Sequence, residues 1–328
     1  MLPIKIILIS IAIIILIVTI NIISPLFINS FQTDTNKNPE SFFIVLCDII
    51  FTIITVPILY IFFPLKHEKF FVNFHTHKKL AILGFICSIA DLSATYAGFT
   101  NRTPADVQVI IANFFFPLTI MINMILKIDY DNREIISFLI IIIGLLVAIL
   151  PLYSEVLLNN INIIWIFVYF ISIFSGVVSY IYQECKLDIN IVTIFFWCNV
   201  YELIFTILLF WLNTIPSIGY NSLDEWWYLF TLNYERLISN QETWLLGIST
   251  TIINNIKILL KLYIIQKVNS SFLGIITSIS NPLSIIVWYF FETIPLDRFI
   301  FELFGTVIII YGFIKYSRNH DETYYFEL

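Results

Sequence analysis

The sequence predicts an all-α polytopic membrane protein, with ten transmembrane helices in a five-plus-five inverted repeat. Three observations support this fold class: the composition, the number and length of the apolar runs, and a similarity between the two halves. Of the 328 residues, 59% are apolar and 12% are charged, whereas soluble domains are about 45–50% apolar and about 25% charged. Water therefore cannot face most of this chain. The high hydrophobicity also excludes a disordered protein.

The charge and the cysteines exclude several functions. The formal net charge is -6, and no basic patch or stripe occurs, so we expect no nucleic acid as a partner. The cysteines lie inside or beside apolar runs, where cysteine behaves as a small hydrophobic residue. Neither a CxxC nor a Cys/His spacing indicates a metal site. We expect no disulfide, no metal and no cofactor involving Cys47, Cys87, Cys185 or Cys198.

Ten apolar runs have roughly the 20-residue length that a spanning helix needs. Their length and their lack of turn residues favour helices over buried strands. The first run is long and rich in isoleucine and has no small-residue cleavage site, so it is interpreted as a retained span rather than a signal peptide. The predicted helices cover residues 6–28, 42–63, 80–99, 105–126, 134–152, 161–182, 190–212, 244–265, 269–291 and 297–316.

These runs divide the chain into two halves, residues 1–152 and residues 153–328. The second half contains the one substantial loop, residues 213–243, and ends in a tail, residues 317–328. The loop includes the sequence Asp224-Glu225-Trp226-Trp227-Tyr228. Because Trp and Tyr favour the headgroup level of a bilayer, we expect an amphipathic interfacial helix in this loop.

The basic residues between the runs predict the orientation, because cytoplasmic loops carry an excess of Lys and Arg. The side of the N-terminus holds 11 of the 17 basic residues and the opposite side holds 4, while Lys257 and Lys261 lie inside the eighth run. Both termini are therefore predicted to face the cytoplasm, and the loop 213–243 to face the lumen or exterior. The 11 residues are Lys5, Lys66, Lys69, Lys78, Lys79, Lys127, Arg133, Lys186, Lys267, Lys315 and Arg318.

The two halves contain a repeat. Residues 102–133 align without a gap on residues 267–298, so that Pro117-Leu118-Thr119-Ile120 matches Pro282-Leu283-Ser284-Ile285. The loops that correspond lie on opposite sides of the predicted membrane, so the repeat is inverted, as is typical of transporters. Pro117 and Pro282 are expected to kink their helices, where the freed backbone groups would line a cavity.

Charges within the predicted helices define the candidate site, because each costs from about 2.5 kcal/mol upward in a membrane. We expect Asp48, Asp91, Glu202 and Lys257 to surround one aqueous cavity for a polar solute. An ion pair between Asp91 and Lys257 is the structural alternative. We also expect Asp91 or Glu202 to couple transport to protons. Amides complete the predicted lining, with interhelical hydrogen bonds as their alternative: Gln108, Asn113, Asn199, Asn254, Asn255 and Asn281.

Four stretches carry a resemblance to a known family through their order and spacing. They are Pro117 to Leu126 followed by Lys127-Ile128-Asp129-Tyr130, then Lys186-Leu187-Asp188-Ile189, Asn254-Asn255, and Tyr263-Ile264-Ile265-Gln266-Lys267 leading into Asn281-Pro282. Over residues 80–316 the chain resembles the chloroquine resistance transporter family of the drug/metabolite transporter superfamily. The resemblance implies a proton-coupled carrier of the vacuole or endolysosome. Such a carrier exports amino acids, peptides or small organic cations to the cytosol by alternating access.

The chain also departs from this family. The loop 213–243 lacks the cysteine pairs of many relatives, the first helix matches poorly, and Glu202 stands where relatives commonly have Gln. The family's cavity is often electronegative, whereas this eighth run carries Lys257 and Lys261.

Two alternative functions therefore stay open. One is an anionic-solute transporter of the same fold, for nucleotide sugars, organic phosphates or glutathione-like thiols. The other is a non-transporting receptor or scaffold. No nucleophile–base constellation and no protease-like aspartate pair indicates an enzyme.

The last four residues, Tyr325-Phe326-Glu327-Leu328, consist of a tyrosine, two residues and a bulky apolar residue. Sorting adaptors read such addresses in short cytoplasmic tails, so an adaptor is a predicted partner and Tyr325 and Leu328 form the motif. Removing these four residues is expected to move a fluorescently tagged protein from the vacuole or endolysosome to the cell surface. Unchanged localisation of the truncated protein would reject the motif.

Overall fold

The computed structural model describes residues 4–30, 41–62, 72–98, 102–103, 108, 111–128, 130–158, 163–187, 189–215, 222–289 and 296–323. Within these residues the protein is helical and contains no strand, which confirms the all-α class. The helices are α1 (Ile4–Ser30), α2 (Ser41–Phe62), α3 (Phe74–Ala97), α5 (Phe115–Ile125), α6 (Asn132–Leu158), α7 (Ile163–Lys186), α8 (Ile191–Leu208), the 3₁₀-helix η1 (Leu209–Thr214), α9 (Leu223–Ser239), α10 (Gln241–Lys267), α11 (Ser270–Tyr289) and α12 (Leu296–Thr323).

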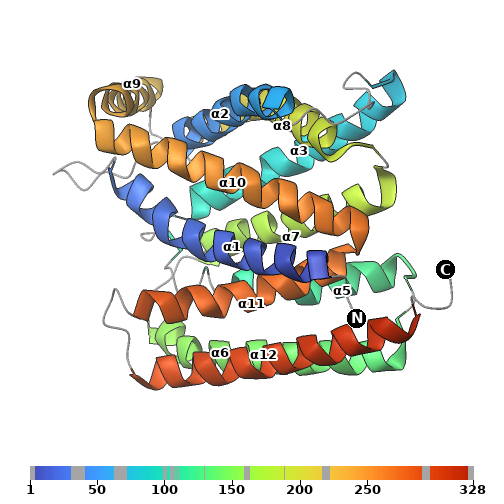
Figure 1. The fold of residues 1–328 in the computed structure, drawn as a ribbon. Helices are drawn as coiled ribbons and strands as arrows, with labels where there is room; N and C mark the ends of the chain where they lie inside the picture. Colours follow the sequence, from blue (N-terminus) through green and yellow to red (C-terminus); the bar gives the residue numbers. More distant parts are fainter. Residues whose placement is uncertain are drawn as a thin grey trace.

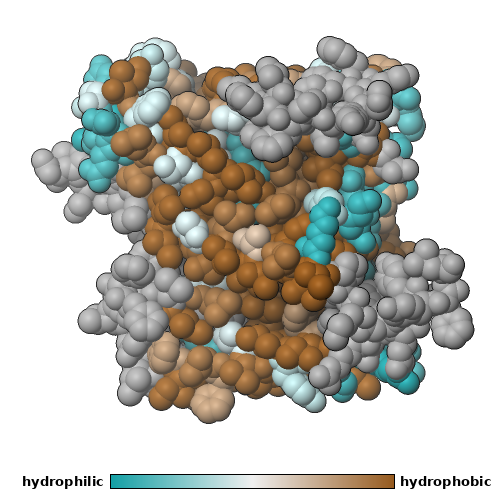
Figure 2. Space-filling model, viewed as in Figure 1, coloured by the Kyte–Doolittle hydropathy of each residue, from teal (hydrophilic) through white to brown (hydrophobic). Residues whose placement is uncertain are grey.

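The protein is a multi-pass membrane protein. In the described part of the chain, six helices are long and apolar enough to cross a membrane, and they belong to α1, α3, α7, α8 with η1, α10 and α12. Large apolar side chains cover the outside: Ile4 is 77% exposed and Ile163 is 78% exposed. Figure 2 shows a face that is mainly hydrophobic, with hydrophilic residues gathered toward its left and right ends. Contiguous apolar surface on this scale is suited to lipid rather than to water.

The long helices lie roughly along one direction and α9 lies across them (Figure 1). The helix α1 begins and α12 ends on the right of this view, and α9 lies on the left. Basic side chains collect at the right-hand end, where Lys79 Nζ donates to the carbonyl oxygen of Lys186 at 3.1 Å. There too, Lys5 Nζ lies 5.3 Å from the ring centroid of Tyr263. We call the two ends of the bundle the basic end and the α9 end.

The helices pack in pairs that come from distant parts of the chain. The helix α6 packs along α12, α3 packs on α7 and α8, and α1 packs on α10 and α11. The helix α5 packs on α7 and α11, and α2 packs on α8. A central cluster of buried side chains, including Phe116, Phe272 and Tyr316, joins several of these pairs. These contacts place the first halves of α2 and α10 beside the second halves of α1 and α3, where the candidate site lies.

Several predicted boundaries differ from those of the structure, and α6 and α12 end later than predicted, at Leu158 rather than 152 and at Thr323 rather than 316. The helix α3 begins at Phe74, earlier than residue 80, because Asn73 caps it by accepting a hydrogen bond from the backbone N–H of Thr76 at 2.9 Å. The fourth run is not one continuous helix, because residues 113–114 form a turn and α5 begins at Phe115. Pro117 therefore lies in the first turn of α5 instead of kinking a helix, and its missing N–H costs no helical hydrogen bond there.

The helix predicted within the loop 213–243 is present as α9, and its place at the membrane interface stays a prediction. Ser222 caps it by accepting from the backbone N–H of Glu225 at 3.1 Å. Its inner face contains Trp226, whose ring centroid lies 4.6 Å from that of Phe210 in η1. Its outer face exposes apolar and aromatic residues, as an interfacial helix requires: Leu223, Trp227, Tyr228, Tyr234 and Ile238.

Candidate functional site

A cavity of about 220 Å³ lies between α1, α2, α3 and α10, in the half of the bundle nearest the α9 end. Two carboxylates line it, Asp48 from α2 and Asp91 from α3. The rest of its polar lining comes from α1, α3 and α10, as Ser24, Thr95, Thr250, Thr251 and Asn254. The structure therefore brings three of the predicted residues, Asp48, Asp91 and Asn254, to one cavity.

The position of Asp48 is fixed by α10. Thr251 Oγ1 donates to one of its carboxylate oxygens at 3.1 Å, and Asn254 Nδ2 approaches the other at 3.4 Å. Thr251 and Asn254 are three residues apart and so share one face of α10. Two donors from one helix hold a carboxylate in place at the cavity wall, where it can also receive a donor from a solute.

Asp91 connects the cavity to the interior of the bundle. It is exposed to solvent although it lies in the membrane-crossing part of α3, because it faces the cavity. Its carboxyl group lies beside that of Glu202 of α8, which is only 5% exposed. Asp91 thus links the cavity to a buried acid on the next helix.

Lys257 of α10 is the cation of the site. It interacts electrostatically with both Asp48 and Asp91. The ion pair between Asp91 and Lys257 that was the structural alternative stays a prediction, and the electrostatic influence of Lys257 extends to Asp48 as well. Counted by formal charge, two carboxylates at the cavity and one ammonium group leave the site negative.

Behind Asp91 lies a cluster that the sequence interpretation missed. Cys198 Sγ of α8 donates to Cys87 Sγ of α3 at 3.7 Å. A carboxylate oxygen of Glu202 and both sulfur atoms lie within 4.8 Å of one another. A spacing of four residues separates Cys87 from Asp91 and Cys198 from Glu202. This spacing places each cysteine and its acid on one helix face, and it is the signal in the sequence that could have revealed the cluster.

Several predicted lining residues lie elsewhere. Gln108 Nε2 donates to the carbonyl oxygens of Gly98 at 2.6 Å and Thr103 at 2.8 Å. Asn199 Nδ2 donates to the carbonyl oxygen of Phe195 on its own helix at 2.7 Å. Asn113 is buried at the turn before α5. Gln108 and Asn199 thus bond to nearby backbone, and none of the three residues is part of the cavity lining that the described residues form.

Asn255 joins two helices. It accepts a hydrogen bond from Thr52 Oγ1 at 2.9 Å and donates one to Thr55 Oγ1 at 2.8 Å. These bonds join α10 to α2, which is the interhelical role that was the alternative to lining the cavity. The side chains of Asn281 and Pro282, which lie in α11, and the residues Tyr325 and Leu328 are outside the described residues.

The basic end is tied together by hydrogen bonds between helices. Asn123 Nδ2 of α5 donates to Tyr130 Oη at 2.9 Å and to Ser271 Oγ of α11 at 3.0 Å. The backbone N–H of Ser270 donates to a carboxylate oxygen of Glu184 of α7 at 2.7 Å. Burial raises the pKa of Tyr130 above its ordinary value, so this hydroxyl stays neutral and shares a hydrogen bond with Ser271 at 2.8 Å.

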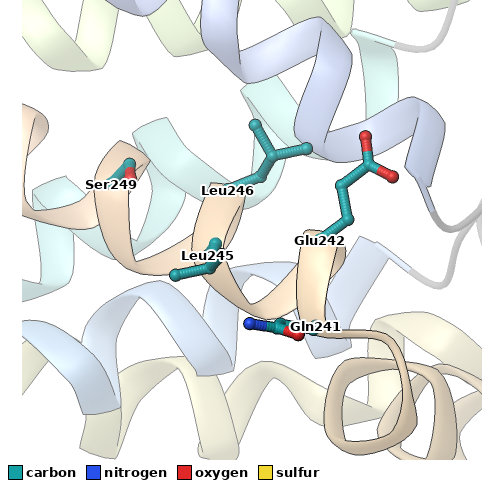
Figure 3. Close-up of a pocket in the computed structure, with 5 residues that line it drawn as sticks. All are labelled: Gln241, Glu242, Leu245, Leu246 and Ser249. Carbon is teal, nitrogen blue, oxygen red and sulfur yellow. The ribbon is translucent and has the colours of Figure 1, made fainter.

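A second, shallower depression of about 490 Å³ lies at the start of α10. Figure 3 shows its five lining residues along the first turns of this helix, with Glu242 and Leu246 rising from one side of it. Only Glu242 among the five carries a charge. The cavity has two carboxylates, Asp48 and Asp91, whereas this depression has one, so a substitution of Glu242 is a suitable control for substitutions in the cavity.

Comparisons with known proteins establish the fold alone. No family model and no curated protein matches the chain. Among solved structures, 24 chains match. One of them, described as "Crystal structure of protein", has a TM-score of 0.65 and 10% sequence identity, with 95% of this chain and 97% of that chain covered. The chain thus shares its fold, over nearly its whole length, with a protein of unrelated sequence.

Proposed function

We propose that the protein is a secondary solute carrier with ten membrane spans and both termini in the cytoplasm. It exports amino acids, peptides or small organic cations from an acidic vacuolar or endolysosomal lumen, coupled to protons, by alternating access. The observation that carries the proposal is the cavity between α1, α2, α3 and α10, where Asp48 and Asp91 are accessible from within a bundle of apolar helices. Ionisable residues at such depth mark a solute or ion pathway.

The packing of the helices supports an inverted repeat of five and five. If α1, α2, α3, α5 and α6 correspond in order to α7, α8, α10, α11 and α12, the contacts recur in symmetric pairs. The packing of α3 on α7 corresponds to that of α10 on α1, and the packing of α5 on α7 to that of α11 on α1. Three helices pack on their own counterparts: α2 on α8, α5 on α11, and α6 on α12. A pseudo-twofold axis would produce this pattern.

The two ends of the bundle differ in the way that alternating access requires. The cavity lies in the α9 half, whereas side chains of α5, α7 and α11 are hydrogen bonded to one another or to neighbouring backbone at the basic end. With the α9 end in the lumen, this arrangement corresponds to a carrier that accepts solute from the lumen. Transport would then require the contacts around Asn123 and Ser271 to break while the cavity closes.

The charge of the site supports a cationic or zwitterionic solute. Two carboxylates face the cavity and one lysine interacts with both, so a cationic group is attracted and an anionic group is opposed. Because Asp48 is held by donors from α10, it presents a fixed acceptor to a solute amine. Acidic groups accessible from an acidic lumen can also accept the coupling proton.

Lys257 favours one other candidate function. An ammonium group beside the cavity could pair with the anionic group of a nucleotide sugar, an organic phosphate or a glutathione-like thiol. The carrier would then be an anionic-solute transporter of the same fold, with Asp48 and Asp91 serving to position Lys257.

Uptake into proteoliposomes separates the two functions. We expect purified protein to transport radiolabelled arginine, a dipeptide or tetraethylammonium, and the rate to change when the pH on one side of the membrane is changed. Liposomes without protein, measured at the same two pH values, are the control. Transport of a nucleotide sugar or glutathione alone would favour the anionic alternative. Flux that ignores an imposed pH gradient would reject proton coupling, and no flux of any of these solutes, with a stable partner retained, would favour a scaffold.

A further inference from the structure

The cysteine pair between α3 and α8 lies at the edge of a hydrophobic cluster and beside two acids. Cys87 and Cys198 are on different helices, and each is followed after four residues by an acid, Asp91 and Glu202. The two sulfur atoms and one carboxylate oxygen of Glu202 lie within 4.8 Å of one another. Cys198 and Glu202 are buried, whereas Asp91 faces the cavity. The cluster thus has a protein interior on one side and a path to solvent on the other.

We propose that Cys87, Cys198 and Glu202 bind a soft divalent cation such as Zn²⁺ or Cd²⁺, with Asp91 or a water molecule from the cavity as the fourth ligand. Thiolate and carboxylate ligands in a tetrahedral set are typical of zinc sites, and soft thiolates select such ions over Mg²⁺ or Ca²⁺.

The distance between the sulfur atoms fits this coordination. With zinc–sulfur bonds of about 2.3 Å, two sulfur ligands at the tetrahedral angle lie about 3.8 Å apart. The observed separation of Cys87 Sγ and Cys198 Sγ is 3.7 Å. The sulfur atoms therefore need almost no movement to share an ion.

Glu202 supplies the second observation. Its Oε1 atom is buried and has no hydrogen-bond partner, although the Asp91 carboxyl group lies beside Glu202. An unpaired buried oxygen of this kind costs free energy, and buried acids are almost always paired or bind a metal. A cation held by the two sulfur atoms would be a partner for this carboxylate.

The backbone holds α3 and α8 at the separation that the site needs. Gly84 of α3 lies where the two helices cross. A Cβ atom at this position would be 2.6 Å from the Cβ atom of Tyr201 and 2.9 Å from the backbone nitrogen of Glu202, both in α8. The absence of a side chain at Gly84 therefore lets α3 approach α8 closely. Cys87 follows Gly84 by one helical turn and so lies against Cys198.

The route to the site passes through the cavity. Asp91 contacts Glu202 and also lines the cavity with Asp48, so an ion that enters the cavity meets carboxylates before it meets the sulfur atoms. Binding as thiolates releases the thiol protons to solvent along the same route. The site does not depend on what the protein transports, and its test needs no transport measurement.

Titration of the purified, full-length protein with Cd²⁺ in detergent and a phosphine reductant tests the site. We expect one ion per chain, with the ultraviolet charge-transfer absorption of cadmium bound to thiolate, and displacement by Zn²⁺ but not by Mg²⁺. The variants Cys87→Ser and Cys198→Ser should each weaken binding at least about 100-fold, more than the loss of an outer-shell group. Glu202→Gln should weaken binding without removing the absorption.

A cysteine outside the site provides the matched control. Cys185 is exposed and belongs neither to the cluster nor to the cavity lining, so the variant Cys185→Ser should bind Cd²⁺ as the original chain does. Size-exclusion chromatography shows whether each variant stays folded. If only one of the two variants Cys87→Ser and Cys198→Ser stays folded, that variant alone suffices for the test. Absence of binding to the reduced original chain, or unweakened binding in either Cys87→Ser or Cys198→Ser, would overturn the proposal.

Discussion

Replacing Asp91 with asparagine is expected to reduce uptake by reconstituted protein more than any other single substitution in the cavity. The amide keeps the size of the side chain and removes its negative charge. Asp91 faces the cavity, lies beside Glu202 and interacts electrostatically with Lys257. A hydrogen bond to a charged group contributes about 1.5–3 kcal/mol, so the apparent affinity for a cationic solute should fall about 10- to 100-fold. Initial rates over a range of solute concentrations measure this change.

Two further variants make the result interpretable. Asp48→Asn removes the other carboxylate of the cavity and should also reduce uptake, which keeps the test sharp if Asp91→Asn does not reconstitute. Glu242→Gln makes the same chemical change in the shallow depression at the start of α10 (Figure 3). It should leave uptake unchanged. Equal rates for the original chain, Asp91→Asn and Asp48→Asn would reject the cavity as the solute site.

The helices were predictable because an apolar run of membrane length has few other structures available to it. The helix α9 was predictable for a related reason, since its Trp and Tyr residues favour the headgroup level, where a helix is expected to lie along the surface. The exact start of α5 was not, because Pro117 is compatible both with a kink inside a helix and with the first turn of one. The turn at residues 113–114 decides between these two positions.

The site was predictable only in part. The sequence shows which residues share one face of a helix, but it does not show which residues of two different helices face each other. Charge inside apolar runs was sufficient to select Asp48 and Asp91. Amides were a weaker guide, because Asn199 donates to its own helix and Asn255 bonds across to α2. The pairing of Cys87 with Cys198 depends on the crossing of α3 and α8 at Gly84, which no local pattern indicates.

The pairing of α6 with α12 leads to the largest expected effect on stability. Gly305 of α12 lies so close to α6 that a Cβ atom would be 2.6 Å from the carbonyl oxygen of Gly144 and 2.7 Å from the backbone nitrogen of Ala148. Backbone atoms cannot rotate away as a side chain can. Small residues at such a crossing are what allow membrane helices to associate closely.

Gly305→Ala should therefore push α6 and α12 apart and destabilise the protein by about 1–3 kcal/mol, the usual cost of overpacking. Gly176→Ala is the matched control, because a Cβ atom there meets only Phe115 Cε2, at 4.0 Å. Alanine is favoured over glycine in a helix by about 1 kcal/mol, so Gly176→Ala should be neutral or stabilising, and any loss in Gly305→Ala must come from packing. Thermal unfolding in detergent, followed by size-exclusion chromatography, compares the two. Equal midpoints would show that α6 and α12 do not depend on this close approach.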